Sequence, residues 1–122
     1  MKTAARLAWE SCDDQSALLN DFCASYQEAI VDVLVTKTQR AMAATHLKSL
    51  VLAGGVAANA RLREKMSIYA KNASIKLYVP SRQFCTDNAA MVAVAASKRL
   101  SRGKKVSADL TPTPIWSLED LS

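Results

Sequence analysis

The feature that most constrains this chain is an apolar periodicity that begins near residue 15. Apolar side chains recur every three or four residues from 15 to 46, a spacing that predicts one long amphipathic helix. They include Leu18, Phe22, Tyr26 and Ile30. The other face is polar, acidic early and basic late, as the helix dipole favours. Packing against this helix should therefore dominate the fold.

Two short apolar segments flank a second helical pattern. Residues 49–53 run into Gly54 and Gly55, which predicts a buried strand ending in a tight turn. Residues 57–72 have helical spacing, and residues 75–80 alternate polar and apolar side chains as a strand does. A strand, a helix and a strand in this order almost always place the two strands in parallel. The expected fold class is α/β, with long helices packed on a β-α-β unit.

The rest of the chain contains one more predicted helix and a tail. Residues 89–96 are small and apolar on every side, which favours a helix buried at the centre of the core. Residues 101–122 begin with basic side chains and later contain two prolines, which predicts a surface tail. We expect a single domain made of a lead-in (1–14), the long helix (15–46), a core (49–100) and this tail.

Composition sets limits on the class of protein. A chain of 122 residues, half of them apolar, can bury one core but is short for an enzyme that closes a cleft between two lobes. No apolar run approaches the roughly 18 residues that a membrane span needs. The first residues lack the apolar core of a signal peptide. We expect a cytoplasmic protein without membrane contact. The net charge of +5 suits an anionic partner but does not single one out.

The reactive side chains are few and widely spaced. Cys12, Cys23 and Cys85 are an odd number without a CxxC pair, which favours reduced thiols over disulfides or a zinc site. Cys23 lies in the apolar stripe of the long helix and is expected in the core. His46 is the single histidine, and no GxSxG motif occurs. The chain is not expected to perform covalent catalysis by itself.

Two short motifs carry the candidate chemistry. Gly54 and Gly55 lie between a predicted strand and helix, where glycines let the backbone approach a phosphate or ribose and Asn59 adds an amide. The same spacing also fits an ordinary strand-to-helix turn. Asp87 stands just before the last predicted helix. Its carboxylate could be an oxygen ligand of a metal, or it could cap the helix. The residues alone leave both alternatives open.

In their order and separation, these motifs resemble those of the TsaD family. The matching segments are LAGGVAAN (52–59), RLR (61–63) and FCTDNAAMVA (84–93), with ASYQEAIVDVL (24–34) and IWSL (115–118) on either side. The resemblance covers most of the chain and implies the carboxyl-terminal lobe of an actin-like, Hsp70-like and sugar-kinase-like (ASKHA) fold. In such a fold, two α/β lobes close on a nucleotide.

The resemblance also implies a reaction and its participants. The TsaD family transfers a threonylcarbamoyl group from threonylcarbamoyl-adenylate to N6 of adenosine 37 in tRNAs that read codons starting with A. By this resemblance, Asn59, with Gly54 and Gly55, contacts the adenylate, and Asp87 is a ligand of a divalent active-site metal, iron or zinc. The implied partners are tRNA, an amino-terminal lobe and, in bacteria, TsaB-like and TsaE-like subunits.

The chain departs from the family pattern in three places. The His-x-x-x-His metal ligands and a glycine-rich substrate loop of the amino-terminal lobe have no counterpart here, and Ala89 replaces the usual glycine. We therefore expect a fragment, a split-gene product or a truncated relative, inactive alone and without a tightly held metal. One alternative is a noncatalytic lobe that acts as an interaction module. Another, a sugar-kinase lobe, is disfavoured by the Cys-Thr-Asp-Asn sequence.

Overall fold

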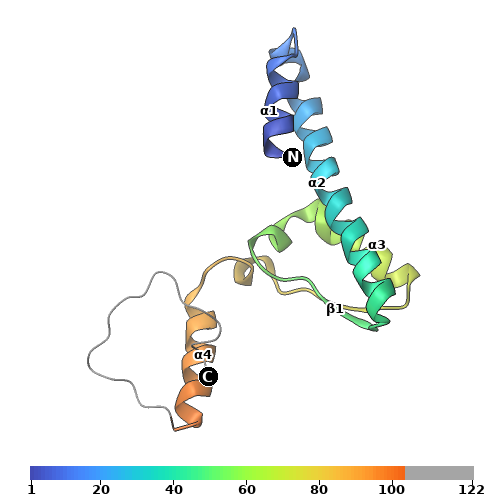
Figure 1. The fold of residues 1–122 in the computed structure, drawn as a ribbon. Coiled ribbons are helices and arrows are strands. Elements are labelled where there is room, and N and C mark those ends of the chain that lie inside the picture. The colour runs from blue at the N-terminus through green and yellow to red at the C-terminus, as the bar shows by residue number, and fades with distance from the viewer. Residues whose placement is uncertain (104–122) are drawn as a thin grey trace. The chain divides into compact units, whose positions relative to one another are not determined.

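The computed structural model describes residues 1–103, which are mostly helical and contain a small two-stranded sheet (Figure 1). The order of elements is α1 (Lys2–Glu10), α2 (Gln15–Thr45), β1 (Ser49–Val51), the 3-10 helix η1 (Gly55–Ala58), α3 (Ala60–Asn72), β2 (Lys76–Tyr78), the 3-10 helix η2 (Arg82–Phe84) and α4 (Ala89–Ser101). The residues fall into two packed units, Met1–Asp87 and a second that begins at Asn88. The predicted tail lies outside the described residues from residue 104 onward.

The long helix predicted from the apolar periodicity is confirmed as α2, which has 31 residues. Asp14 caps its start, because its side chain accepts a hydrogen bond from the Ala17 N–H at 3.0 Å, and this bond lowers the pKa of Asp14. The helix ends at His46 in a left-handed conformation (φ 55°), with the His46 N–H donating to the Met42 carbonyl. Among residues 1–103, no helix has both the length and the apolarity of a membrane span.

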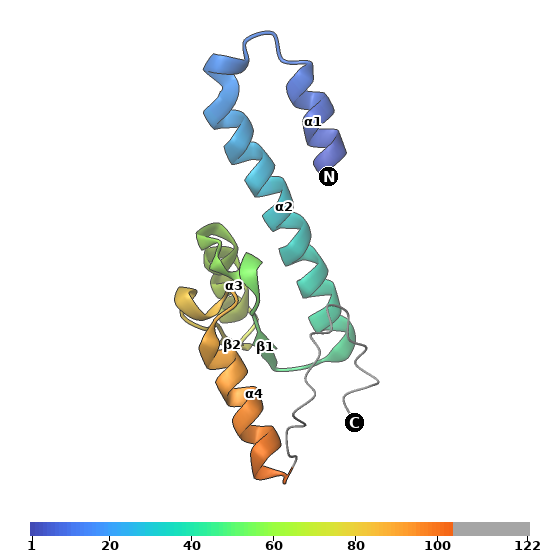
Figure 2. The same cartoon turned by 90° about the vertical axis from the view of Figure 1, so that its left-hand side faces the viewer.

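The predicted lead-in contains a helix of its own. α1 lies beside the first half of α2 and runs antiparallel to it (Figures 1 and 2). The Trp9 and Phe22 rings form this contact, with centroids 4.9 Å apart. Cys23 does not share in it and is exposed, so its expected core position is wrong. The buried thiol of the chain is Cys85.

The core of the first unit lies between α2 and α3. Val31 and Val35 of α2 meet two buried α3 side chains, Leu62 and Met66. Three partly buried leucines complete this core: Leu50, Leu52 and Leu77. It therefore joins the long helix to the β-α-β unit.

The two strands are parallel, as the β-α-β pattern predicts, with Leu50 opposite Leu77 and Val51 opposite Tyr78. Because side chains alternate across a strand, the leucines face the core while the other pair faces away. Val51 is 68% exposed. The expectation of a buried first strand is therefore wrong for one of its two faces.

The helix predicted after Asn88 is confirmed as α4, but its predicted burial is wrong. Asn88 caps it by accepting a hydrogen bond from the Met91 N–H at 3.1 Å. No residue of α4 is buried, and Val92 and Val94 are 70% and 60% exposed. A helix with apolar side chains on every side is buried only where neighbours cover several of its sides, which the exposure of α4 does not show.

An ion-pair network borders the contact between α2 and α3. The Glu28 carboxylate accepts two hydrogen bonds from the Arg61 guanidinium, each 2.9 Å long, and also pairs with Lys65. Arg61 bonds Glu64 at 2.8 Å, and Lys65 pairs with Asp32. Hydrogen bonding from Arg61 first, and from Lys65 second, lowers the pKa of Glu28 to about 2. The charged form of Glu28 is therefore favoured by folding.

This shift predicts how acid acts on the contact. A carboxylate whose pKa is lower in the folded state stabilises that state above its unfolded pKa, here 4.5. The stabilisation should be lost as the pH falls from 4.5 to about 2. Thermal unfolding followed by circular dichroism across this range should show it. Glu28→Gln removes the titrating group but leaves Asp14, so a variant with the same acid dependence as the parent would contradict the prediction.

Exposed apolar side chains predict self-association of the chain. Large uncovered apolar surfaces are normally hidden by association. Light scattering over a concentration series should detect dimers or larger species. Val92→Ser combined with Val94→Ser should shift the chain toward monomer, whereas Lys98→Ser on the same helix should not. A strictly monomeric parent chain that binds no hydrophobic dye would show that its surface needs no partner.

Candidate functional site

The glycine-rich motif forms a tight turn between β1 and α3. Gly54 has φ +88° and ψ 172°, a conformation that side chains with a Cβ rarely adopt. Its carbonyl accepts a hydrogen bond from the Ala57 N–H at 3.0 Å, which starts the single turn of η1. Both Gly54 and Gly55 are exposed. The turn therefore presents backbone to solvent, and Gly54 is the position where its shape requires glycine.

Asn59 lies at the start of α3 and connects it to α2. The helix begins at Ala60 and not at residue 57 as predicted, because η1 occupies residues 55–58. The Asn59 side-chain oxygen accepts a hydrogen bond from the Leu62 N–H at 3.0 Å, and its amide nitrogen donates to the Gln27 side-chain oxygen at 3.0 Å. These bonds use one of two lone pairs and one of two hydrogens. The amide therefore keeps one acceptor and one donor position for a ligand.

Asp87 is exposed at the end of the first unit. It does not cap α4, because the cap is Asn88. The metal alternative has no completed ligand set either: among residues 1–103, no three His, Cys, Asp or Glu side chains are grouped to hold an ion. The described residues do not fit a metal site by themselves. Asp87 can supply one carboxylate at most.

Arg63, which sequence reasoning did not single out, bridges the two motifs. Its Nε donates to the Ala57 carbonyl at the end of the glycine-rich turn. Its Nη2 donates to the Pro80 carbonyl at 2.8 Å and to the Cys85 Sγ at 3.0 Å. Cys85 is 2% exposed. One guanidinium therefore holds the turn before α3 against the segment that leads to Asp87.

A hollow of about 270 Å³ adjoins Asn59. It lies between α2 on one side and η1 and the start of α3 on the other. Its lining residues are Cys23, Tyr26, Gln27, Ile30, Val31, Leu34, Val56, Asn59 and Leu62. Most of these are apolar, with the Gln27 and Asn59 amides as polar groups. An apolar wall with a few placed polar groups is typical of small-molecule sites, and this one is near their lower size limit.

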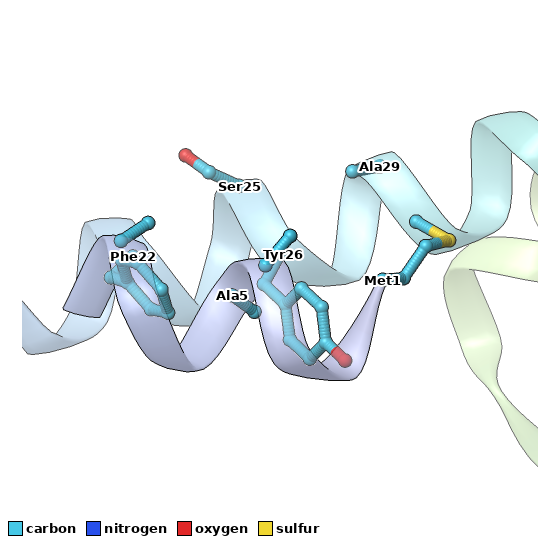
Figure 3. A pocket seen from close by; sticks show the side chains of 8 residues that line it. Met1, Ala5, Phe22, Ser25, Tyr26 and Ala29 are labelled. Atoms are coloured by element: carbon cyan, nitrogen blue, oxygen red, sulfur yellow. The ribbon is translucent and has the colours of Figure 1, made fainter. Parts of the chain in front are cut away.

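A larger hollow, of about 340 Å³, lies between α1 and α2. Figure 3 shows the Phe22 and Tyr26 rings side by side along it, with Met1 at its far end. Its lining contains no residue of either motif. Size alone therefore does not identify the site, and the hollow beside Asn59 is the better candidate.

Comparison with protein families decides the relationship. The family model for TsaD, tRNA N6-adenosine threonylcarbamoyltransferase, matches residues 1–94. The chain belongs to the TsaD family. Membership in the TsaD family implies the ASKHA fold.

Individual relatives agree with the family. The tRNA N6-adenosine threonylcarbamoyltransferase of Geotalea uraniireducens is 46% identical over 104 residues, which cover 85% of this chain and 30% of the relative. The protein of the same name from Anaeromyxobacter dehalogenans is 48% identical over 101 residues, covering 82% and 30%. That from Bdellovibrio bacteriovorus is 45% identical over 96 residues, covering 79% and 28%. The chain thus spans less than a third of the length of these TsaD relatives.

The geometry predicts separable roles for the two ends of the Asn59 amide. Asn59→Ala removes the cap of α3 and should lower the free energy of unfolding by about 1 kcal/mol. Asn59→Asp keeps an oxygen that can accept from the Leu62 N–H, so it should cost less. Urea unfolding of the parent and both variants measures this. Equal losses for the two variants would show that the bond to Gln27, and not the cap, carries the stability.

Proposed function

We propose that this chain provides the carboxyl-terminal part of the site of a tRNA threonylcarbamoyladenosine transferase of the TsaD family. The observation that carries the proposal is the bridge made by Arg63, which brings the glycine-rich turn and the segment before Asp87 together. These are the two segments that the family resemblance assigns to the adenylate and the metal. A site shared between distant segments requires such a connection.

The proposed substrates are threonylcarbamoyl-adenylate and tRNA. In the transfer, N6 of the tRNA adenosine forms a bond to the carbamoyl carbon, the bond from that carbon to the adenylate oxygen breaks, and AMP leaves. The proton lost from N6 passes to a base that this chain does not identify. Asn59 would hold the adenylate with its remaining donor and acceptor, while the exposed backbone of Gly54 and Gly55 lies against it.

Asp87 is proposed as one ligand of a metal whose other ligands come from the amino-terminal lobe of the family. An isolated carboxylate holds a divalent ion weakly, because it supplies little of the coordination that iron or zinc takes. No step of the transfer is derived from that ion. An amino-terminal lobe and, in bacteria, TsaB-like and TsaE-like subunits are the proposed protein partners.

The alternative function is a noncatalytic interaction module of the same fold. The exposed apolar side chains of α4 favour it, since such surfaces mark sites of protein association. It differs from the transferase proposal in one respect. A module needs the surface but has no use for the chemistry of Asn59 and Asp87.

Complementation distinguishes the two functions. A cell lacking its own transferase should regain threonylcarbamoyladenosine in tRNA, measured by mass spectrometry, when it makes this chain together with a TsaD amino-terminal lobe. The chain alone should restore none, because it lacks the rest of the site. Asp87→Ala and Asn59→Asp should reduce the modified nucleoside, the second because a carboxylate repels the adenylate phosphate.

The exposed Asp13 provides the matched control, since Asp13→Ala removes a carboxylate far along the chain from both motifs. It should leave the modification at the parent level. If the two chains associate and the tRNA still lacks the modification, the transferase proposal is wrong and the interaction module is supported. If Asp87→Ala restores the modification at the parent level, the proposed role of Asp87 as a metal ligand is wrong.

A further inference from the structure

We infer that Arg63 is a positioning residue that fixes the glycine-rich turn relative to the Pro80–Cys85 segment. This inference deepens the proposed function and rests on it, since it assigns a task to a residue that touches neither substrate. It starts from what Arg63 bonds. All three acceptors lie outside its own helix: the Ala57 carbonyl in η1, the Pro80 carbonyl and the Cys85 Sγ.

The chemistry of the guanidinium explains why an arginine stands here. Arginine presents five N–H donors in a rigid plane, so one side chain can hold several acceptors at fixed angles. Two of these acceptors are backbone carbonyls, and a carbonyl that is buried away from water needs another hydrogen-bond donor. A charged donor also makes stronger hydrogen bonds than a neutral one. Arg63 therefore fixes backbone positions on two segments at once.

The neighbouring charges show that Arg63 is not part of the surface ion-pair network. Arg61, two residues earlier, pairs with Glu28 and Glu64, and Lys65, two residues later, pairs with Glu28 and Asp32. Side chains two residues apart on a helix point in different directions, so Arg63 does not face the partners of Arg61 and Lys65. Arg63 has no carboxylate partner among the described residues and bonds two carbonyls and a sulfur instead.

The consequence concerns the two proposed site residues. Asn59 lies two residues after Ala57, and Asp87 lies two residues after Cys85. Each is held by short backbone connections to an atom that Arg63 contacts. The bridge adds a direct link between the segment from Pro80 to Asp87 and the turn, beside the link that β2 makes through its pairing with β1. Precise placement matters, because small displacements of groups that hold a substrate reduce its reaction strongly.

The test measures the separation of the two segments directly. A chain with Cys12→Ser, Cys23→Ser, Cys85→Ala and Gln83→Cys carries a nitroxide label at residue 83, and it keeps both carbonyl acceptors of Arg63. The label should broaden the NMR amide signals of Gly54 and Gly55. Adding Arg63→Gln should weaken this broadening, because the segment then varies more in its distance from the turn. Arg63→Lys should restore part of it, since an ammonium reaches one carbonyl but does not form the planar fork.

Arg61→Gln is the matched control. It removes an arginine from the same helix and breaks the Glu28 pair, but it should leave the broadening unchanged. Unchanged broadening in both Arg63 variants would overturn the inference. The signals of α3 show whether each variant is folded, and the lysine variant decides the matter if the glutamine variant is not.

Titration of the same chains with AMP separates this inference from the proposed function. The parent should show AMP-induced shifts at Asn59, and Arg63→Gln should weaken them while Arg63→Lys recovers part. AMP shifts of equal size in parent and Arg63→Gln would make Arg63 a packing residue only and overturn its positioning role. If AMP shifts nothing in the parent, the nucleotide role of Asn59 fails, and the nitroxide result, which needs no ligand, still decides on Arg63.

Discussion

The contact between α2 and α3 is the interaction on which the described structure of the first unit depends. Val31 and Val35 pack against Leu62 and Met66, and the leucines of the small sheet close this cluster. Truncating a buried leucine typically costs about 2 to 5 kcal/mol. The network around Glu28 is only half-buried, so solvent screens it and it contributes less than the apolar contact.

This contact also explains where the candidate site lies. Leu62 anchors the first turn of α3 on α2, and the same turn carries Asn59 as its cap and Arg63 as its bridge. Gln27 on α2 then holds the Asn59 amide from the opposite side. Packing of Leu62 in the apolar core therefore positions Asn59 and Arg63, which lie on the same turn. Side chains on the first turn of a packed helix, as Asn59 and Arg63 are, gain rigidity that a free loop would not supply.

The apolar periodicity correctly predicted the elements that depend on local sequence and on the order of elements. The bounds of α2 followed from its apolar spacing, and the parallel pairing of β1 and β2 followed from the order strand, helix, strand. The start of α3 was placed three residues early, because η1 continues a helical pattern while its backbone makes tighter bonds. α1 was read as a lead-in, since its packing depends on one aromatic contact to α2 that periodicity does not reveal.

The candidate site was predictable only in part, and Arg63 shows why. The motifs named Gly54, Gly55, Asn59 and Asp87 as candidates, and their chemical roles stay predictions. Their connection was hidden, because an arginine on a helix between two other charged residues has the pattern of a solvent-exposed face. Only the fold places two carbonyls and a thiol at its guanidinium. The burial predicted for Cys23 and α4 was wrong for a related reason. An apolar pattern shows that burial would be favourable, but it does not show whether other residues pack against that surface.

The same reasoning bears on the choice between transferase part and interaction module. A fold needs a glycine at position 54 and a cap at position 59, so those residues would be retained for structure alone. A fold does not need an exposed carboxylate at Asp87, because Asn88 already caps α4. The described contacts give Asp87 no structural role, and the proposed shared site gives it a chemical one.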